Sequence, residues 1–204
     1  MANLLRDVYS FGELQILSEG KSGCGPMKVR GRFQKANLKN QNGRIYDSKI
    51  LRREIDNLQP MISERRLVGE LDHPTDEVVH LTNASHLITG LHMDGDEVVG
   101  EAEVLNTPAG KVLKELLSAG VKVGISSRGV GGLSFNEEKD AYMVDENLRL
   151  ITWDMVSDPS CQDAFPGLME GVISENRQKI DKGVDHARAE KVYIHALSKH
   201  LNKN

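Results

Sequence analysis

The sequence predicts an α+β fold in which mostly antiparallel strands form a barrel or a sheet, accompanied by two helices. Several short segments alternate apolar and polar residues, as half-buried strands do, whereas two longer segments repeat apolar residues at helical spacing. The strand segments follow one another mostly through turns, which disfavours an alternating βαβ fold. A chain of 204 residues suits one such domain with short appendages at its ends.

The central region opens with a predicted strand, MKVRGRFQKAN at residues 27–37. The Asn42-Gly43 pair then signals a turn. A helix is expected to follow, because Asp47 is well placed to cap its N-terminus and apolar residues recur at helical spacing beyond it, at Ile50, Leu51, Ile55 and Leu58.

A hairpin is predicted in the segment SHLITGLHMDGDEVVGEAEVL at residues 85–105. Two alternating strands flank Asp94-Gly95-Asp96, a combination that is typical of a tight turn. The stretch LVGELDHPTD at residues 67–76 precedes this hairpin, and its apolar beginning resembles a strand.

The segment TPAGKVLKELLSAG is the best predicted helix of the chain. Thr107 can cap it, Pro108 suits its first position, and Gly120 is suitably placed to end it. A strand is expected over residues 121–131, followed by a polar loop and a further strand in residues 148–160.

Composition and charge favour an ordinary globular protein. Hydrophobic residues make up 39% of the chain, yet no apolar run approaches the ~18 residues of a membrane-spanning helix. Aromatic residues make up only 4% and the formal net charge is -4, so neither base stacking nor a basic field indicates nucleic acid. The charged N-terminus does not resemble a secretory signal, and Cys24 and Cys161 match no metal spacing, which favours a reduced cytoplasmic setting.

Two consecutive hydroxyls, Ser126 and Ser127, follow a strand-like stretch in VKVGISSRGVG. Serines in such a place are usually turn residues. A serine nucleophile instead requires a base that accepts its proton and a third group that orients the base. Strand alternation directs the two side chains to opposite faces, so only one of them is expected to reach a given base.

His73 is the strongest candidate for that base, since it follows an apolar stretch and precedes Pro74, which restricts the exit of the chain. Its neighbour Asp72 is a poor orienting group, because adjacent side chains diverge. Packing in the hairpin explains His86. The remaining histidines lie near the hairpin or in the polar C-terminal region: His80, His92, His186, His195 and His200.

An acid within an otherwise apolar strand needs a partner or a role, and this singles out Asp154 in LITWDMV. Alternation places Asp154 on the same face as Thr152 and Val156. Asp158 precedes Pro159 and has the character of a turn residue.

Five stretches of the chain resemble, in order, the prohead maturation proteases of tailed phages: NQNGRIYDSKIL, GELDHPT, SHLITGL, TPAGKVLKELLSAGVKVGISSRGVG and DMVSDPSCQDAF. The resemblance implies a fold similar to herpesvirus assemblin, a mostly antiparallel β-barrel surrounded by helices. It also implies a serine endopeptidase that digests the internal scaffold and trims capsid proteins inside the immature prohead, in the host cytoplasm. Such an enzyme needs neither a metal nor an organic cofactor.

Matched residue by residue, the resemblance makes His73 the base and Ser126 the nucleophile, with Ser127 as the alternate. Ser126 is preferred because it falls third in Gly-Ile-Ser, where related proteases place their serine. The third member varies among relatives, and Asp154 is preferred over its alternate Asp158. In a separate role, the next two residues after the serines, Arg128 and Gly129, are expected to shape the oxyanion site.

The resemblance further implies partners and self-processing. The substrates would be the phage scaffold or core proteins and the major capsid protein, and a homo-oligomer is left open. Proteases of this type cut after Glu in apolar-x-Glu sequences, and three such sequences suggest self-cleavage, after Glu19, Glu170 and Glu175. They adjoin the expected boundaries between a peripheral, propeptide-like segment (residues 1–26), a protease domain (residues 27–170) and a basic helical tail (residues 171–204).

Two other functions remain open from the residues alone. The first is a non-enzymatic scaffold or capsid-assembly protein, in which the serines are turn residues. The second is an inactive protease homologue that keeps the fold. The order of base, nucleophile and acid along the chain favours the protease.

Overall fold

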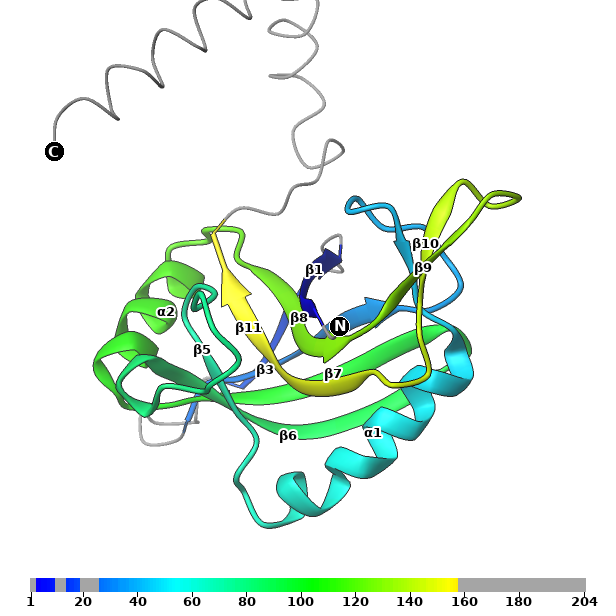
Figure 1. The fold of residues 1–204 in the computed structure, drawn as a ribbon. Coiled ribbons are helices and arrows are strands. Elements are labelled where there is room, and N and C mark those ends of the chain that lie inside the picture. The colour runs from blue at the N-terminus through cyan, green and yellow to red at the C-terminus, as the bar shows by residue number, and fades with distance from the viewer. Residues whose placement is uncertain (1–2, 10–13, 19–25, 158–204) are drawn as a thin grey trace, which may run out of the picture. The chain divides into compact units, whose positions relative to one another are not determined.

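The described strands of the protein form three sheets (Figure 1). The structure is a computed structural model that describes residues 3–9, 14–18 and 26–157. The chain divides into two units, residues 1–161 and 162–204, and all described residues belong to the first. The expected helical tail lies outside the described residues.

The largest sheet has five strands in the order β2-β3-β7-β6-β5, each antiparallel to its neighbours. These strands are Gln15–Ser18 (β2), Lys28–Lys35 (β3), Val68–Glu70 (β5), Ala84–Asp94 (β6) and Glu97–Val104 (β7). β3 is the strand predicted at residues 27–37, and β6 and β7 form the predicted hairpin, with Asp94 paired to Glu97 across its turn. These predictions are confirmed. Both rest on alternating residues and turn residues within one short segment, which are local signals.

The second sheet carries the serines and has the order β1-β8-β11, all antiparallel. Its strands are Asn3–Tyr9 (β1), Gly124–Gly131 (β8) and Arg149–Val156 (β11). The third sheet, β4-β10-β9, consists of Arg44–Ile45 (β4), Leu133–Asn136 (β9) and Ala141–Val144 (β10), and its β4 and β10 run parallel.

Two helices and one short 3₁₀ turn complete the described residues: Ser48–Ser63 (α1), Pro108–Ser118 (α2) and the turn Leu81–Asn83. Both predicted caps are present, since the Asp47 carboxylate accepts from the N–H of Lys49 and the Thr107 hydroxyl from that of Gly110. α1 packs against β6 and β11, and α2 packs against β6 and β7. Of the described helices, none has the length and apolar character required to cross a bilayer.

The core joins the first two sheets through large apolar side chains. Phe33 of β3 and Trp153 of β11 are both fully buried, and their ring centroids are 6.2 Å apart in a tilted arrangement. Burial of one such side chain contributes about 3 kcal/mol. Because Trp153 points into the core, strand alternation directs its neighbour Asp154 to the opposite face of β11.

The two sheets approach most closely where β5 ends. There Leu71 forms an isolated parallel bridge with Met155 of β11. The pairing does not extend into a continuous ladder, so the described strands do not form a closed barrel. The expected α+β character agrees with the three sheets and two helices, whereas the expected barrel is not confirmed.

Residues 3–9 of the expected N-terminal segment form an edge strand of the second sheet. β1 pairs with β8 from Asn3 to Tyr9, and both Leu5 and Asp7 are buried. The Asp7 carboxylate accepts hydrogen bonds from Asn42, Arg44 and Tyr46. Residues 3–9 are therefore an integral part of a sheet, and the buried charge of Asp7 is what masks the strand pattern in the sequence.

Candidate functional site

Ser126 lies on β8 directly opposite Asp154 of β11. Side chains of residues paired across antiparallel strands point to the same face of the sheet, about 5 Å apart at their Cβ atoms. Both residues are fully buried. The strand register thus places a hydroxyl and a carboxylate side by side, with space for one further group to bridge them.

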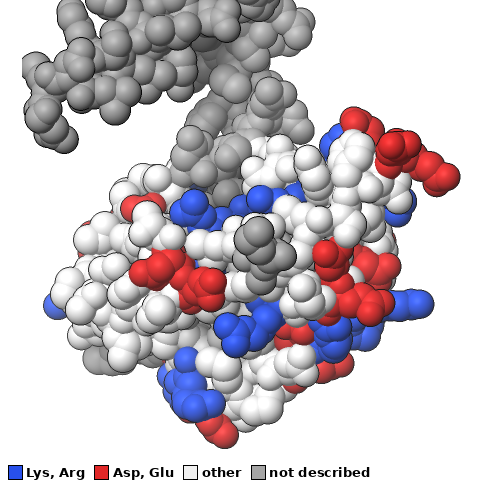
Figure 2. All heavy atoms as spheres, in the orientation of Figure 1, with Lys and Arg blue, Asp and Glu red and all other residues white. Residues whose placement is uncertain are grey.

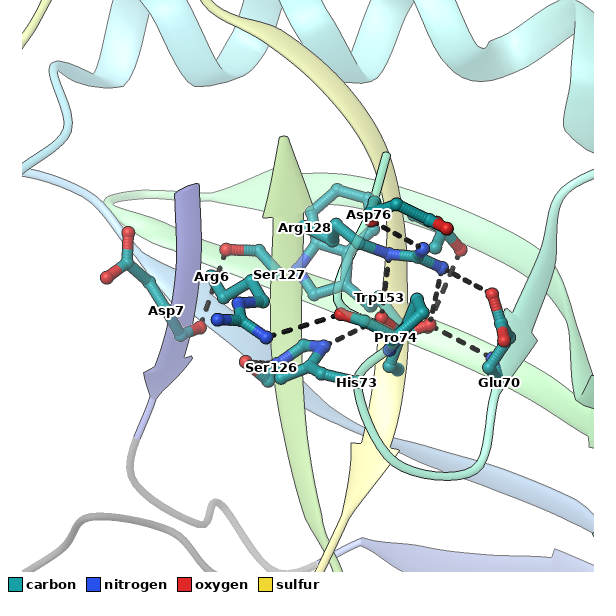
Figure 3. Close-up of polar contacts among 12 residues, drawn as sticks. Arg6, Asp7, Glu70, His73, Pro74, Asp76, Ser126, Ser127, Arg128 and Trp153 are labelled. Atoms are coloured by element: carbon teal, nitrogen blue, oxygen red, sulfur yellow. Dashed lines mark hydrogen bonds and ion pairs between the residues drawn. The ribbon is translucent and has the colours of Figure 1, made fainter. Parts of the chain in front are cut away.

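His73 is that bridging group. Its Nε2 lies 2.5 Å from Ser126 Oγ (Figure 3), and its Nδ1 lies 2.8 Å from Asp154 Oδ2. A carboxylate can only accept, so Nδ1 carries the hydrogen and Nε2 is free to accept from the Ser126 hydroxyl. The structure therefore brings the three predicted residues together in the order serine, histidine, aspartate.

The approach of β5 to β11 brings the histidine into this position. The N–H of Asp72 donates to the carbonyl of Met155 at 2.8 Å, beside the bridge between the two sheets. Asp72 has a φ of 63°, a left-handed conformation that Asp tolerates better than most residues, and it turns the chain back over β8. Asp72 thus shapes the backbone and, as expected, does not orient the imidazole.

Ser127 points away from His73. Its hydroxyl is 3.5 Å from the carbonyl of Asp7 in β1, a long and weak hydrogen bond, on the opposite side of β8 (Figure 3). The alternation argument therefore distinguishes the two serines correctly in geometry. The other alternate, Asp158, lies outside the described residues, as do the three self-cleavage candidates Glu19, Glu170 and Glu175.

The role expected for Arg128 and Gly129 in an oxyanion site stays a prediction. The Arg128 guanidinium is fully buried and contacts the carboxylates of Glu70 and Asp154, so this side chain is directed to the acid side of the site. A side chain at Gly129 would meet the carbonyl of Arg149, so this glycine permits the close approach of the neighbouring strand β11. Arg128 lies on the same face of β8 as Ser126, but its binding partners come from distant parts of the chain.

Glu70 is a site residue that has no role in the sequence-based assignment. It is fully buried at the end of β5, its N–H donates to Asp154 Oδ1 at 3.0 Å, and its side chain binds Arg128. An available signal is that Glu70, like Asp154, is an acid within an apolar strand stretch, which needs a partner or a role.

His86 has a structural role and does not belong to the site. Its Nε2 lies 3.0 Å from the carbonyl of Trp153, and its Nδ1 lies 2.9 Å from the Ser85 hydroxyl. Burial lowers the pKa of His86 to about 4, which the nearby Asp154 charge and the Trp153 hydrogen bond only partly oppose. The neutral ring links β6 to β11 from beneath the site, in agreement with its expected packing role.

Charge and ligand geometry add two observations. Acidic and basic side chains are interspersed over the face drawn in Figure 2, as a formal net charge of -4 allows. Within the described ranges, no cluster of three or more His, Cys, Asp or Glu side chains could hold a metal ion.

Comparisons with known proteins identify the family and the fold of the chain. A family model described as prohead core protein serine protease matches residues 13–177. The prohead core protein protease of Enterobacteria phage T4 is 31% identical over 142 residues, which cover 67% of this chain and 66% of that relative. The solved structure of the bacteriophage T4 capsid assembly protease, gp21, matches with a TM-score of 0.69 and 26% identity, covering 78% of this chain and 99% of that one. The match to this solved structure confirms the mixed α+β fold.

Proposed function

Because the chain belongs to the family of prohead core protein serine proteases, we propose that it is a serine endopeptidase of phage capsid maturation with Ser126 as its nucleophile. The observation that carries the proposal is the position of His73, whose two ring nitrogens contact Ser126 and Asp154 at 2.5 and 2.8 Å. A serine used only in a turn would need neither contact. Ser127 lacks this arrangement, since its hydroxyl faces β1.

The reaction would be acyl transfer. Ser126 Oγ attacks the scissile carbonyl while His73 Nε2 removes its proton, and the tetrahedral intermediate then collapses as the same proton passes to the leaving amine. Asp154 Oδ2 holds the Nδ1–H and stabilises the imidazolium that forms in between. A water molecule, deprotonated by His73, hydrolyses the acyl-enzyme and restores the serine.

The proposed substrates are core and capsid proteins inside the immature prohead, as the names of the T4 relatives suggest. The proposal includes cleavage after Glu in apolar-x-Glu sequences, and self-processing after Glu19, Glu170 and Glu175 follows from the same preference. The first of these positions, Glu19, directly follows β2 (Gln15–Ser18) in the sequence.

The test uses the full chain, with Ser126→Ala and Ser127→Ala beside it. Intact masses are recorded over time, with a peptide that contains an apolar-x-Glu sequence as added substrate. Cleavage is expected in the wild type and in Ser127→Ala and is expected to disappear in Ser126→Ala. Cleavage that persists in Ser126→Ala would refute the nucleophile, and an inert wild type with an intact peptide would favour the non-enzymatic assembly protein.

A further inference from the structure

Asp154 is held by groups other than the histidine. Its Oδ1 accepts from the N–H of Glu70 at 3.0 Å and from Arg128 Nη2 at 3.2 Å, so this oxygen is directed away from the imidazole. Arg128 Nε also lies 3.0 Å from Oδ2, an ion pair without hydrogen-bond alignment. These contacts fix the rotation of the carboxylate so that Oδ2 faces the Nδ1 of His73.

Arg128 is in turn held by Glu70. Arg128 Nη2 donates to Glu70 Oε1 at 2.9 Å, and both side chains are almost completely buried. A buried guanidinium needs compensating charge and hydrogen bonds, because removal from water costs several kcal/mol per ion. The two carboxylates supply that compensation from β5 and β11.

The same pair is connected to the loop that carries His73. Arg128 Nη1 donates to the carbonyl of Val78 at 2.9 Å, and Glu70 Oε1 accepts from the N–H of His80 at 3.0 Å. Residues 71–80 are therefore anchored at both ends, through the bridge at Leu71 and through this buried pair. Arg128 thus contacts both the Asp154 carboxylate and the loop that carries His73.

We propose that Arg128 and Glu70 are positioning residues that orient Asp154 and set the net charge of its surroundings. The inference rests on the proposed function of His73 and Ser126. Asp154, Glu70 and Arg128 together carry two negative charges and one positive charge, which leaves one net negative charge beside His73. One such charge balances the imidazolium that forms during catalysis.

This arrangement predicts that substitutions of Arg128 and Glu70 shift the pH dependence of activity in opposite directions. Without Arg128, the excess negative charge would favour the imidazolium and move the acid limb of kcat/KM to higher pH. Without the charge of Glu70, the excess positive charge would move it to lower pH.

The pH profiles of the variants must be interpreted with all charged groups that face Arg128 from the surrounding elements. They come from β5, β11, the loop and β1, where Arg6 is the direct strand partner of Arg128. The set comprises Glu70, Asp154, His73, His80, Asp76 and Arg6. None of the proposed substitutions changes the others, so the two shifts of opposite sign can be assigned to the buried pair.

The experiment measures kcat, KM and the pH profile of peptide cleavage by the full chain. Arg128→Gln and Glu70→Gln are each expected to lower kcat about 10- to 100-fold, a loss of the size found at metal sites when a residue that orients a directly acting group is removed. KM is expected to change little. The double variant restores charge balance, so its acid limb is expected to return toward that of the wild type.

Glu54→Gln is the matched control. Glu54 is also a buried carboxylate that contacts an arginine and accepts from a backbone N–H, that of Leu150 in β11, yet it touches neither His73 nor Asp154. This variant is expected to lose stability without a shift of the acid limb. Arg128→Lys, which keeps the charge, is expected to keep the wild-type acid limb even if kcat falls.

Three outcomes separate the alternatives. Equal pH profiles in all folded variants would overturn the inference while leaving the protease intact. Shifts of the same sign in Arg128→Gln and Glu70→Gln would also overturn it, since they would report general disruption. If Arg128→Gln does not fold by circular dichroism, Glu70→Gln and Arg128→Lys decide the question alone. Failure of the proposed function is distinct, because the wild type would then cleave nothing or Ser126→Ala would still cleave.

Discussion

Asp154 and Ser126 are direct partners across β11 and β8, and the imidazole of His73 spans their side chains. The distance between hydroxyl and carboxylate is therefore set by a strand pair and not by loops. Only the base comes from a loop, and that loop is tied to β11 by the Leu71–Met155 bridge. Precise placement of this kind is what acyl transfer requires, because small displacements of the reacting groups are costly to the rate.

Asp154→Asn is expected to lower kcat by about 10⁴-fold, the loss that this exchange causes in serine proteases of the same geometry. The amide can donate to Nδ1, which would place the imidazole hydrogen on Nε2 and leave nothing to accept the Ser126 proton. KM is expected to stay within a few-fold, since Asp154 is buried away from solvent. Steady-state peptide cleavage measures both values. A fall in kcat below tenfold would contradict the role of Asp154.

Ser127→Ala is expected to retain nearly full activity. Its hydroxyl makes one long hydrogen bond of 3.5 Å, so its removal should change the free energy of unfolding by less than about 1 kcal/mol. Urea unfolding and peptide cleavage provide the measurements. A loss of activity in this variant together with an active Ser126→Ala would exchange the roles of the two serines.

His86 predicts a dependence of stability on pH. Its pKa is about 4 in the folded protein, below the ordinary value of about 6.5, so the unfolded state binds more protons between these values. Stability from this residue is therefore complete above about pH 6.5 and is lost as the pH falls toward 4, by up to about 3 kcal/mol. The control is His86→Gln, which can still donate to the Trp153 carbonyl and should lose less stability over this range. Urea unfolding at a series of pH values tests this difference, and parallel curves would contradict it.

Asp7→Ala is expected to destabilise the fold by about 3 to 5 kcal/mol, because it leaves the buried partners of a charged network without their acceptor. The partners are Asn42, Arg44 and Tyr46, which tie β1 to the turn before α1. Asp140→Asn is the control, since it removes the charge that pairs with Lys39 on an exposed surface and keeps a residue type suited to the φ of 45° at this position, so it should change stability by less than about 1 kcal/mol. Equal effects in thermal or urea unfolding would show that β1 contributes little.

Local patterns predict much of this protein because the signals for those elements lie within short windows. The caps at Asp47 and Thr107, the hairpin turn and the strands around Ser126 and Asp154 all follow from neighbouring residues. Alternation also separates Ser126 from Ser127, which is a strictly local distinction. The resemblance to known motifs then supplies the pairing of His73 with these strands, which no local pattern contains.

Other features depend on contacts that are distant in sequence, and these escape prediction. The guanidinium of Arg128 is directed by Glu70 and Asp154, which are 58 and 26 positions away. The strand β1 is stabilised by partners for Asp7 that are 35 to 39 positions away, and the charge breaks its apolar pattern. A buried charge cannot be recognised as buried until its partners are known.

The pairing of β1 with β8 means that the proposed cut after Glu19 would change how β1 is held in its sheet. Such a cut would convert an intramolecular strand into a bound peptide, because residues 3–9 contribute a full edge of the sheet that contains Ser126. Occupancy of that edge would then follow mass action and fall on dilution. In the crowded interior of a prohead the fragment would rebind. Protease released from a broken shell would lose the fragment, and β8 would then lack one of its two neighbouring strands.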